Sequence, residues 1–277
     1  MKTRKNKKGA ESIKKSQRDL IKSYWSQQAV KHGKSHVASW SDLRVIEMEI
    51  RELDKHLSDG DRVLDAGCAN GYMSIQLARK KEIEITGIDY SRKMIDQARS
   101  MLNGLKGDFV QRINFKTDDI TRLKEADRVY DKVIVVRVLI NLHNWGSQLK
   151  GLRECVRVLK PGGRLLLSEA TLQGWQRLNK FRNEWGLPKI PMPWFNRYLD
   201  QEKVVKAVSP LLQLVDIINF ASTYYIGTRV LKPLLAIGRD IDTANPNMEW
   251  NRWFSQLPSW GDYGTQKLFV FKKQLGE

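Results

Sequence analysis

The chain has 277 residues, a net charge of +17, a hydrophobic fraction of 41% and nine tryptophans. This composition excludes an intrinsically disordered chain, because such chains lack the apolar and aromatic residues that a core requires. No apolar stretch nears the roughly 20 residues of a membrane span, and the basic N-terminus lacks the roughly 7-to-15-residue apolar run of a signal peptide. We therefore expect a cytoplasmic protein that forms one domain with appendages.

Much of the positive charge lies at the N-terminus. Residues 1–40 carry eleven basic and only two acidic side chains. We expect residues 1–22 to be a basic, disordered tail, since short runs of like charge are usually solvated. The alternative role of this tail is to bind RNA as an electrostatic arm.

Residues 23–60 are expected to form a lid and a helix. The polar and aromatic stretch 23–40, which Gly33 interrupts, predicts a short helix and an ordered loop. Apolar side chains then recur at helical spacing from Leu43 to Leu57, behind Ser41 and Asp42 as candidate caps. This pattern predicts an amphipathic helix.

Residues 61–170 alternate short apolar runs with helical patterns, which is typical of βαβ units around a parallel sheet. The expected strands are 63–64, 83–88, 113–116, 132–138 and 164–168, and the expected helices are 72–80, 91–105 and 145–159. The turn Lys160-Pro161-Gly162-Gly163 ends the last helix. The pattern predicts a doubly wound α/β core.

Residues 171–277 are expected to cover an acceptor site and to complete the sheet of the same domain. The tract 174–199 is rich in Trp and Pro and is too long for a tight loop, so we expect it to cover the site. A strand at 211–220, a helix at 222–237 and a final strand at 267–272 follow.

The first strand of the core leads into a glycine-rich turn. In an open parallel sheet, ligands bind beyond the carboxyl ends of the strands, where Gly67 and Gly71 let a ligand approach the backbone. Asp65 can accept hydrogen bonds from an ammonium group, and Asp89, at the end of the second strand, can bind both hydroxyls of a ribose. This order predicts a nucleoside-binding site.

A nicotinamide dinucleotide is the obvious competitor for such a site. Its fingerprint is G-x-G-x-x-G, with the pyrophosphate on a helix N-terminus. Here three residues separate Gly67 from Gly71, and Ala69 stands between them. A ligand without phosphate therefore fits the turn better.

The order Asp65-x-Gly67-Cys68-x-x-Gly71, followed by Ile88-Asp89-Tyr90-Ser91, resembles class I S-adenosylmethionine-dependent methyltransferases. The resemblance continues in order over about residues 60–170 and departs at Ala69, where many members have Gly. It implies a Rossmann-like, doubly wound and mostly parallel seven-stranded sheet with an antiparallel last strand and a helical lid. It also implies S-adenosylmethionine as the cofactor, without a metal.

The resemblance also implies roles for individual residues. The first acid and the glycine loop hold the methionine part, the acid after the second strand holds the ribose, Tyr90 and Met94 match the adenine-packing segment, and Asp119, with Asp118 as the alternate, meets the adenine amino group. Strand four ends at Arg137, under the sulfonium. The expected cofactor-binding residues are Asp65, Gly67, Cys68, Ala69, Gly71, Asp89, Tyr90, Met94, Asp119, Ile120 and Arg137.

A catalytic base is expected close to the end of the fourth strand. His143 follows this strand and can deprotonate an acceptor hydroxyl, whereas the alternative is a packing or helix-capping histidine. His32 and His36 have a spacing that suits a metal, but no third ligand is evident, so we expect no metal site. Cys68 and Cys155 are expected on the ligand loop and on a core-facing helix, without a disulfide.

The acceptor is indicated by elimination and by resemblance. The end of strand four lacks the Asp/Asn-Pro-Pro-Tyr motif of base amino methylation, and no Pro-Cys nucleophile for cytosine is present. The aromatic region before the last strand resembles small-molecule and glycan methyltransferases. We therefore expect methylation of an oxygen on a small molecule or sugar. The alternatives are an RNA methyltransferase that uses the basic tail and a noncatalytic, cofactor-binding regulatory module.

Overall fold

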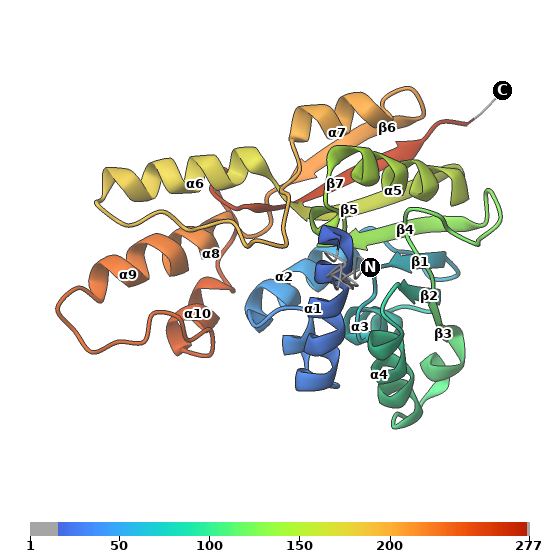
Figure 1. The fold of residues 1–277 in the computed structure, drawn as a ribbon, viewed down its shortest axis with the longest axis horizontal. Coiled ribbons are helices and arrows are strands. Elements are labelled where there is room, and N and C mark those ends of the chain that lie inside the picture. Colours follow the sequence, from blue (N-terminus) through green and yellow to red (C-terminus); the bar gives the residue numbers. More distant parts are fainter. Residues whose placement is uncertain (1–15, 276–277) are drawn as a thin grey trace, which may run out of the picture.

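The structure is a computed structural model that describes residues 16–275, so most of the expected tail lies outside the described residues. Its centre is a seven-stranded sheet of order β3-β2-β1-β4-β5-β7-β6 (Figure 1). The strands are β1 (Arg62–Ala66), β2 (Glu84–Asp89), β3 (Ile113–Thr117), β4 (Tyr130–Val136), β5 (Leu159–Ala170), β6 (Leu212–Ile218) and β7 (Gln266–Lys273). Strands β1 to β5 are parallel, and β7 runs antiparallel to both β5 and β6. The expected Rossmann-like sheet is confirmed.

Helices cover both faces of this sheet. Val63 packs in a cluster with α2 (Leu43–Asp54), α3 (Tyr72–Lys80) and α4 (Arg92–Asn103). Its neighbour Leu64 points to the opposite face and packs in a cluster with α5 (Trp145–Val158) and α7 (Gln201–Val208). Successive strand residues face opposite sides, so an apolar run without alternation is what a doubly covered strand requires.

Side-chain caps explain where the core helices begin. Asp42, one of the two expected caps, accepts a hydrogen bond from the backbone N–H of Val45 at 3.4 Å and begins α2. Asn144 accepts from the N–H of Ser147 at 2.9 Å and begins α5. These oxygens satisfy backbone donors that the first helical turn leaves unpaired.

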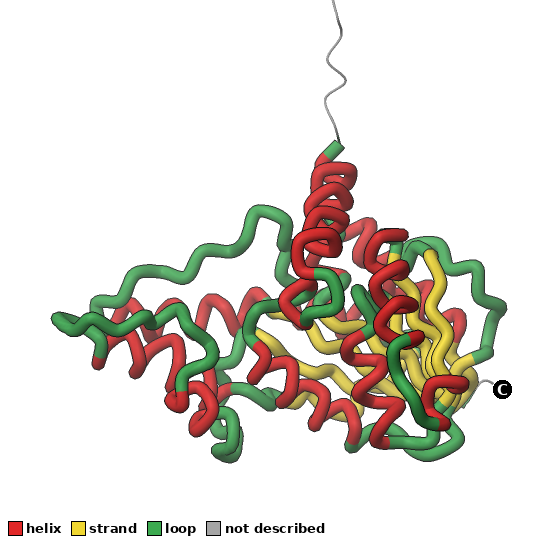
Figure 2. The backbone as a smooth tube through the Cα atoms, turned by 90° about the horizontal axis from the view of Figure 1, so that it is seen from below, coloured by secondary structure: helices red, strands yellow, loops and turns green. Residues whose placement is uncertain are grey.

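The N-terminal boundary differs from the expectation. Helix α1 (Gln17–His32) begins after Ser16, so residues 17–22 belong to a helix and not to a tail. It ends at Gly33, and a 3₁₀ turn, η1 (His36–Ala38), follows. Only Ile21 and Ala29 of α1 are buried, which is why no apolar period marks the helix in the sequence. Helix α1 projects from the body of the molecule (Figure 2).

The region after the core contains more helix than expected. The tract 174–199 is not one irregular cover, because α6 (Leu172–Glu184) occupies its first half behind the cap Thr171. The expected helix at 222–237 is α8 (Ser222–Ile226), a π-helical turn η4 (Gly227–Leu231) and α9 (Lys232–Leu235). With α6 and α10 (Glu249–Phe254), these elements form a lobe beside the sheet (Figure 1).

Two further 3₁₀ turns complete the described chain, η2 (Asp108–Arg112) and η3 (Leu139–Asn141). Within residues 16–275, no helix combines the length and the apolar character that crossing a membrane would need.

Candidate functional site

A cavity of about 700 Å³ lies where the parallel strands end. Its walls come from the ends of β1, β2, β4 and β5, from the start of β7, from α1 and from the segment after α6. The expected residues that line it are Asp65, Gly67, Cys68, Ala69, Asp89, Tyr90, Met94, Asp119, Ile120, Arg137 and His143. The cavity therefore occupies the position where open α/β sheets bind ligands.

The two glycines of the loop have different tasks. Gly67 lines the cavity at φ +97°, and a Cβ at this residue would collide with the side chain of Val138. Gly71 begins α3 at φ +78°, and its missing Cβ leaves room for Phe115, whose ring atom would lie 2.6 Å away. In the described structure Gly71 lies behind the cavity lining, so it shapes the turn without facing a ligand.

Ala69 lines the cavity in the left-handed region of the backbone, with φ +49°. This is the position where the sequence departs from the resembled pattern. The left-handed conformation costs an L-residue about 1 kcal/mol, which glycine avoids. The loop thus keeps the backbone geometry of a glycine turn while it carries a methyl group.

Asp65 is a buried carboxylate at the end of β1. The hydroxyl of Ser74 on α3 donates to it at 2.5 Å. Burial raises the pKa of Asp65 to about 6. A cationic ligand group beside this carboxylate would therefore stabilise its charged form.

Asp89 ends β2 and faces the same loop. It accepts backbone hydrogen bonds from Ala69 at 3.2 Å and from Ser91 at 2.8 Å. Burial, with a smaller contribution from the nearby charge of Asp65, raises the pKa of Asp89 to about 6. The two acids therefore make this end of the cavity strongly negative.

The two adjacent acids after β3, Asp118 and Asp119, have different hydrogen-bond partners. Both oxygens of Asp118 accept backbone hydrogen bonds, from Asp119 and from Lys124, each at 2.9 Å. Asp119 accepts from the hydroxyl of Thr121 at 2.7 Å and pairs through its other oxygen with Arg18 of α1. Asp118 therefore holds the loop, and Asp119 is the acid that reaches the roof of the cavity.

Helix α1 forms that roof. The ammonium of Lys22 lies 5.9 Å from the ring centre of Tyr90, and Met94 packs in a small cluster with Ala29 and Trp25 of α1. The Tyr90 hydroxyl is buried without a hydrogen-bond partner among residues 16–275, and burial raises its pKa above the usual range. Asn70 ties the following turn down by donating to the carbonyls of Gly33 and Ser35 at 2.9 and 2.8 Å.

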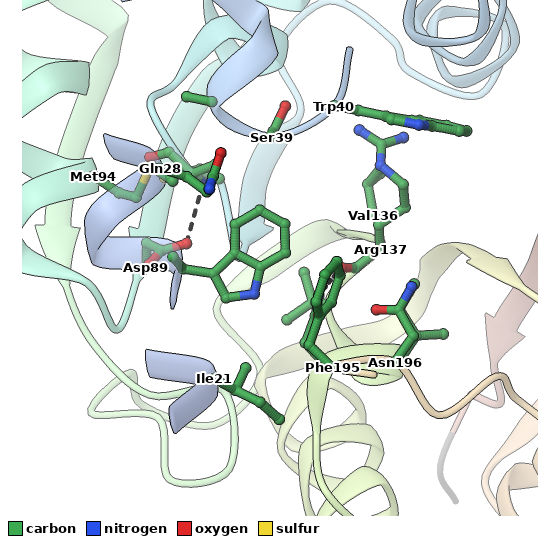
Figure 3. A pocket seen from close by; sticks show the side chains of 18 of the residues that line it. Ile21, Gln28, Ser39, Trp40, Asp89, Met94, Val136, Arg137, Phe195 and Asn196 are labelled. Atoms are coloured by element: carbon green, nitrogen blue, oxygen red, sulfur yellow. Dashed lines mark hydrogen bonds between the residues drawn. The ribbon is translucent and has the colours of Figure 1, made fainter. Parts of the chain in front are cut away.

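The sequence analysis missed an ion pair on the cavity wall. Arg137, in the left-handed region at φ +55°, pairs with Glu49 of α2, and its guanidinium lies 4.6 Å from the ring centre of Trp40 (Figure 3). Ser168 and Gln266 also donate to the buried Glu49, Gln266 at 3.1 Å. A signal existed, because Glu49 is an acid on the apolar face of the expected helix 43–57.

The far side of the cavity is lined by aromatic and neutral polar groups. Phe195 and Asn196 lie across the cavity from Asp89 and Met94 (Figure 3). The ring of Tyr24 on α1 stacks on Phe195 with centres 4.5 Å apart, and Trp25 meets Phe195 edge-on at 5.6 Å. The segment after α6 therefore packs against α1 at this end of the cavity.

His143 lines the cavity between η3 and α5. The cap of α5 is Asn144, so His143 is not the capping residue. Of the aromatic pair at 224 and 225, only Tyr225 lines the cavity, whereas the Tyr224 hydroxyl donates to Asp42 at 2.8 Å. Arg229 pairs with the same Asp42, so Tyr224 and Arg229 hold the lobe against α2.

Both cysteines are free and buried. Cys68 lines the cavity, and burial raises the pKa of its thiol well above the usual range. The protonated, small side chain agrees with packing in the loop.

Comparison with known proteins places the chain in a family. Residues 57–202 match a family described as a methyltransferase domain. A 27-O-demethylrifamycin SV methyltransferase of Amycolatopsis mediterranei is 36% identical over 116 residues, which are 42% of this chain and 41% of that relative. The U6 snRNA methylphosphate capping enzyme Amus of Drosophila melanogaster is 28% identical over 193 residues, 63% of this chain and 64% of that enzyme.

A solved structure extends the likeness to nearly the whole fold. Magnesium protoporphyrin IX methyltransferase from Synechocystis, determined with bound SAH, has a TM-score of 0.59 at 16% identity and covers 92% of this chain and 99% of its own. The curated relatives are matched over shorter spans, less than half of the rifamycin relative. The family match covers more than half of this chain and includes the glycine loop and both acids. The chain belongs to the class I S-adenosylmethionine-dependent methyltransferases.

Proposed function

We propose that this chain transfers a methyl group from S-adenosylmethionine to an oxygen atom of a small-molecule acceptor. The observation that carries the proposal is the pair of acids at the strand ends beside a glycine turn, Asp65, which is buried, and Asp89, which is partly buried. A family member with this pair intact keeps the groups that a methionine ammonium and a ribose require.

The residues fit the cofactor group by group. Asp65 faces the cavity with one oxygen bound to Ser74, and its raised pKa reflects a burial that a cation would offset. Asp89 suits two adjacent hydroxyls, and Tyr90, Met94, Asp119 and Ile120 would enclose the adenine. Gly67, Cys68 and Ala69 would hold the methionine part through the backbone.

S-adenosylmethionine supplies a methyl group on a sulfonium sulfur, and an acceptor oxygen that displaces this sulfur gains the methyl group and loses its hydroxyl proton. The chain's task is then alignment, exclusion of water and removal of the proton. Helix α1 and Phe195 enclose the cavity, which restricts water.

His143 is the residue that we assign to the proton. It lines the cavity just after β4, and a neutral imidazole can accept a proton from a hydroxyl group near neutral pH. We expect His143→Ala to lower turnover by about 100-fold while the affinity for S-adenosylhomocysteine stays within about twofold. Unchanged turnover by the variant would remove His143 from the mechanism.

RNA is the second candidate acceptor. Residues 1–40 carry eleven basic side chains, and one relative acts on an RNA by its name. Such binding would weaken steeply as salt concentration rises, because the cations displace counterions from phosphates. The rifamycin relative, whose name specifies an oxygen, favours a small molecule.

The decisive test is to incubate the protein with a cell extract and S-adenosylmethionine labelled in the methyl group. Label in the small-molecule fraction is the expected result, and Asp89→Ala is the control that should lose it. Label in RNA would replace the proposed acceptor with the second candidate. Cofactor binding without label in any fraction would favour a noncatalytic binding module.

A further inference from the structure

We infer that the acceptor is an uncharged molecule with a flat aromatic ring at its reacting hydroxyl. The inference rests on the proposed function and names the substrate class for the same cavity. Its basis is the contrast between the two sides of that cavity, which the order of the strands separates.

Charged groups gather on the cofactor side. Asp65 and Asp89 lie at the ends of β1 and β2, and Asp118 and Asp119 follow β3, so these acids belong to one side of the sheet. Arg18 and Lys22 of α1 also belong to this side, because they contact Asp119 and Tyr90. The remaining charged lining residue at the outer end of α1 is Asp19.

The side formed by β4, β5 and β7 has a different character. Arg137 is its charged lining residue, and the ion pair with Glu49 compensates it. The buried carboxylate also accepts from Ser168 and Gln266, so its own charge is fully engaged. A charged acceptor would lose its hydration here without gaining a counterion, which disfavours its binding.

Aromatic rings form much of the wall on this side. The lining residues of this kind are Tyr24, Trp40, Phe195, Tyr198 and Tyr225, and Trp25 lies between them and the Met94 cluster. The Tyr24 and Phe195 rings are stacked, and Trp25 and Trp194 meet the Phe195 ring edge-on, so these side chains brace one another. Rigid aromatic walls favour a flat apolar ligand.

The neutral polar groups on this side are mostly occupied within the protein. The amide nitrogen of Asn141 donates to the Arg137 carbonyl at 2.6 Å, and the amide nitrogen of Gln266 donates to Glu49 at 3.1 Å. The amide oxygens of Asn141 and Asn196 have no partner within the described part of the chain. A sugar requires many more free polar partners than this side offers.

The test compares three ligands that differ in one property each. They are 2-naphthol, which is flat and neutral, decahydro-2-naphthol, which is neutral but not flat, and 6-hydroxy-2-naphthoate, which is flat but anionic. Binding is measured by calorimetry, with and without S-adenosylhomocysteine. The affinity for S-adenosylhomocysteine is measured first, so that failure of the proposed function is seen separately from failure of this inference.

We expect 2-naphthol to bind at least about tenfold more tightly than either of the other two ligands. Equal or tighter binding of the naphthoate would overturn the charge argument, and equal binding of the saturated alcohol would overturn the argument from flatness. Undetectable binding of 2-naphthol at millimolar concentration would overturn the inference as a whole.

Two substitutions test whether 2-naphthol binds against the aromatic wall of the cavity. Phe195→Leu should weaken 2-naphthol binding about tenfold without changing the affinity for S-adenosylhomocysteine. The matched control is Trp260→Leu, because Trp260 is 84% exposed and lies outside the cavity lining. If Phe195→Leu loses S-adenosylhomocysteine binding, Tyr24→Leu replaces it. Full 2-naphthol affinity in the variant that retains S-adenosylhomocysteine binding would contradict the inference.

Discussion

The two sides of the cavity are built by different means. On the side of β1 to β3, the lining residues come from the ends of consecutive strands and the turns that follow them, as with Asp65, Asp89 and Asp119. On the side of β4, β5 and β7, the lining joins segments distant in sequence, such as Trp40, Phe195 and Gln266. Local chain geometry therefore positions the first side, and packing of the lobe and of α1 positions the second.

The two sides also differ in electrostatics. Asp65 is buried and Asp89 is partly buried, neither forms an ion pair among the described residues, and loss of hydration raises the pKa of each to about 6. Glu49 is as buried as Asp65 but has Arg137, Ser168 and Gln266 as partners. In the described structure, the first arrangement leaves two carboxylates without a counterion at the cavity, whereas in the second Arg137 balances the charge of Glu49 within the fold.

The largest effect is expected when the ion pair between Glu49 and Arg137 is broken. Glu49→Gln leaves the guanidinium of Arg137 without its counterion, which should lower the free energy of unfolding by about 3 kcal/mol. Urea denaturation measures the loss. Glu47→Gln is the control on the same helix, because Glu47 is partly exposed and pairs with Arg44 at the surface, so about 1 kcal/mol or less is expected. Equal losses in both variants would contradict the assigned role of Glu49.

The next largest effect is expected on ligand affinity when Asp89, which has no counterion among the described residues, is removed. Asp89→Ala removes a carboxylate that would hold ribose hydroxyls and should weaken S-adenosylhomocysteine binding by about 100-fold or more, since charge-assisted hydrogen bonds are the strong ones. Calorimetry gives the affinity. Asp96→Ala removes an exposed carboxylate from α4 and should change nothing. Micromolar affinity retained by Asp89→Ala would count against the proposed site.

Lowering the pH should affect ligand binding and protein stability in opposite directions through Asp65 and Asp89. Below pH 6, Asp65 and Asp89 become protonated, so the affinity for S-adenosylhomocysteine should fall by about tenfold per pH unit or more between pH 6 and 5. The stability of the ligand-free protein should respond in the opposite direction. These acids bind protons more tightly when folded than when unfolded, so their contribution to stability is lost as the pH rises through about 6.

Calorimetry across pH 5 to 8 tests the binding part of this expectation. Asp65→Asn should reduce the pH dependence, because one of the two titrating acids is then absent. An affinity that stays constant from pH 5 to pH 8 would show that neither carboxylate needs its charge to hold the ligand.

The smallest effect is a change in the free energy of unfolding caused by a substitution in the glycine loop. Ala69→Gly should raise the free energy of unfolding by at most about 1 kcal/mol, because relief of the left-handed conformation is offset by the greater freedom of unfolded glycine. Ala66→Gly, in the buried strand β1, is the control and should destabilise. Destabilisation of Ala69→Gly as large as that of the control would mean that the Ala69 methyl group packs and is not strained.

Much of the fold, and the grouping of acids at the ends of β1 to β3, could be predicted from the sequence. The strands from 63 to 138 and the helices 72–80 and 145–159 were expected close to their observed bounds, because periodicity and caps are local signals. The fifth strand was expected too late, because β5 begins at Leu159 and includes the expected turn 160–163. Helix α1 was placed too late and α6 was missed. Both have few buried side chains relative to their length, so no strong apolar period marks them.

The sequence by itself determined the family, the sheet and the acids of the cofactor side, because residues at the ends of successive parallel strands must meet at one edge. The tertiary structure decided that Gly67 faces the cavity while Gly71 makes room for Phe115. It also decided that Glu49 lies beside Arg137 and that Phe195 lies beneath α1. These contacts join residues between 88 and 171 positions apart, and side-chain packing over such separations leaves no local pattern to read.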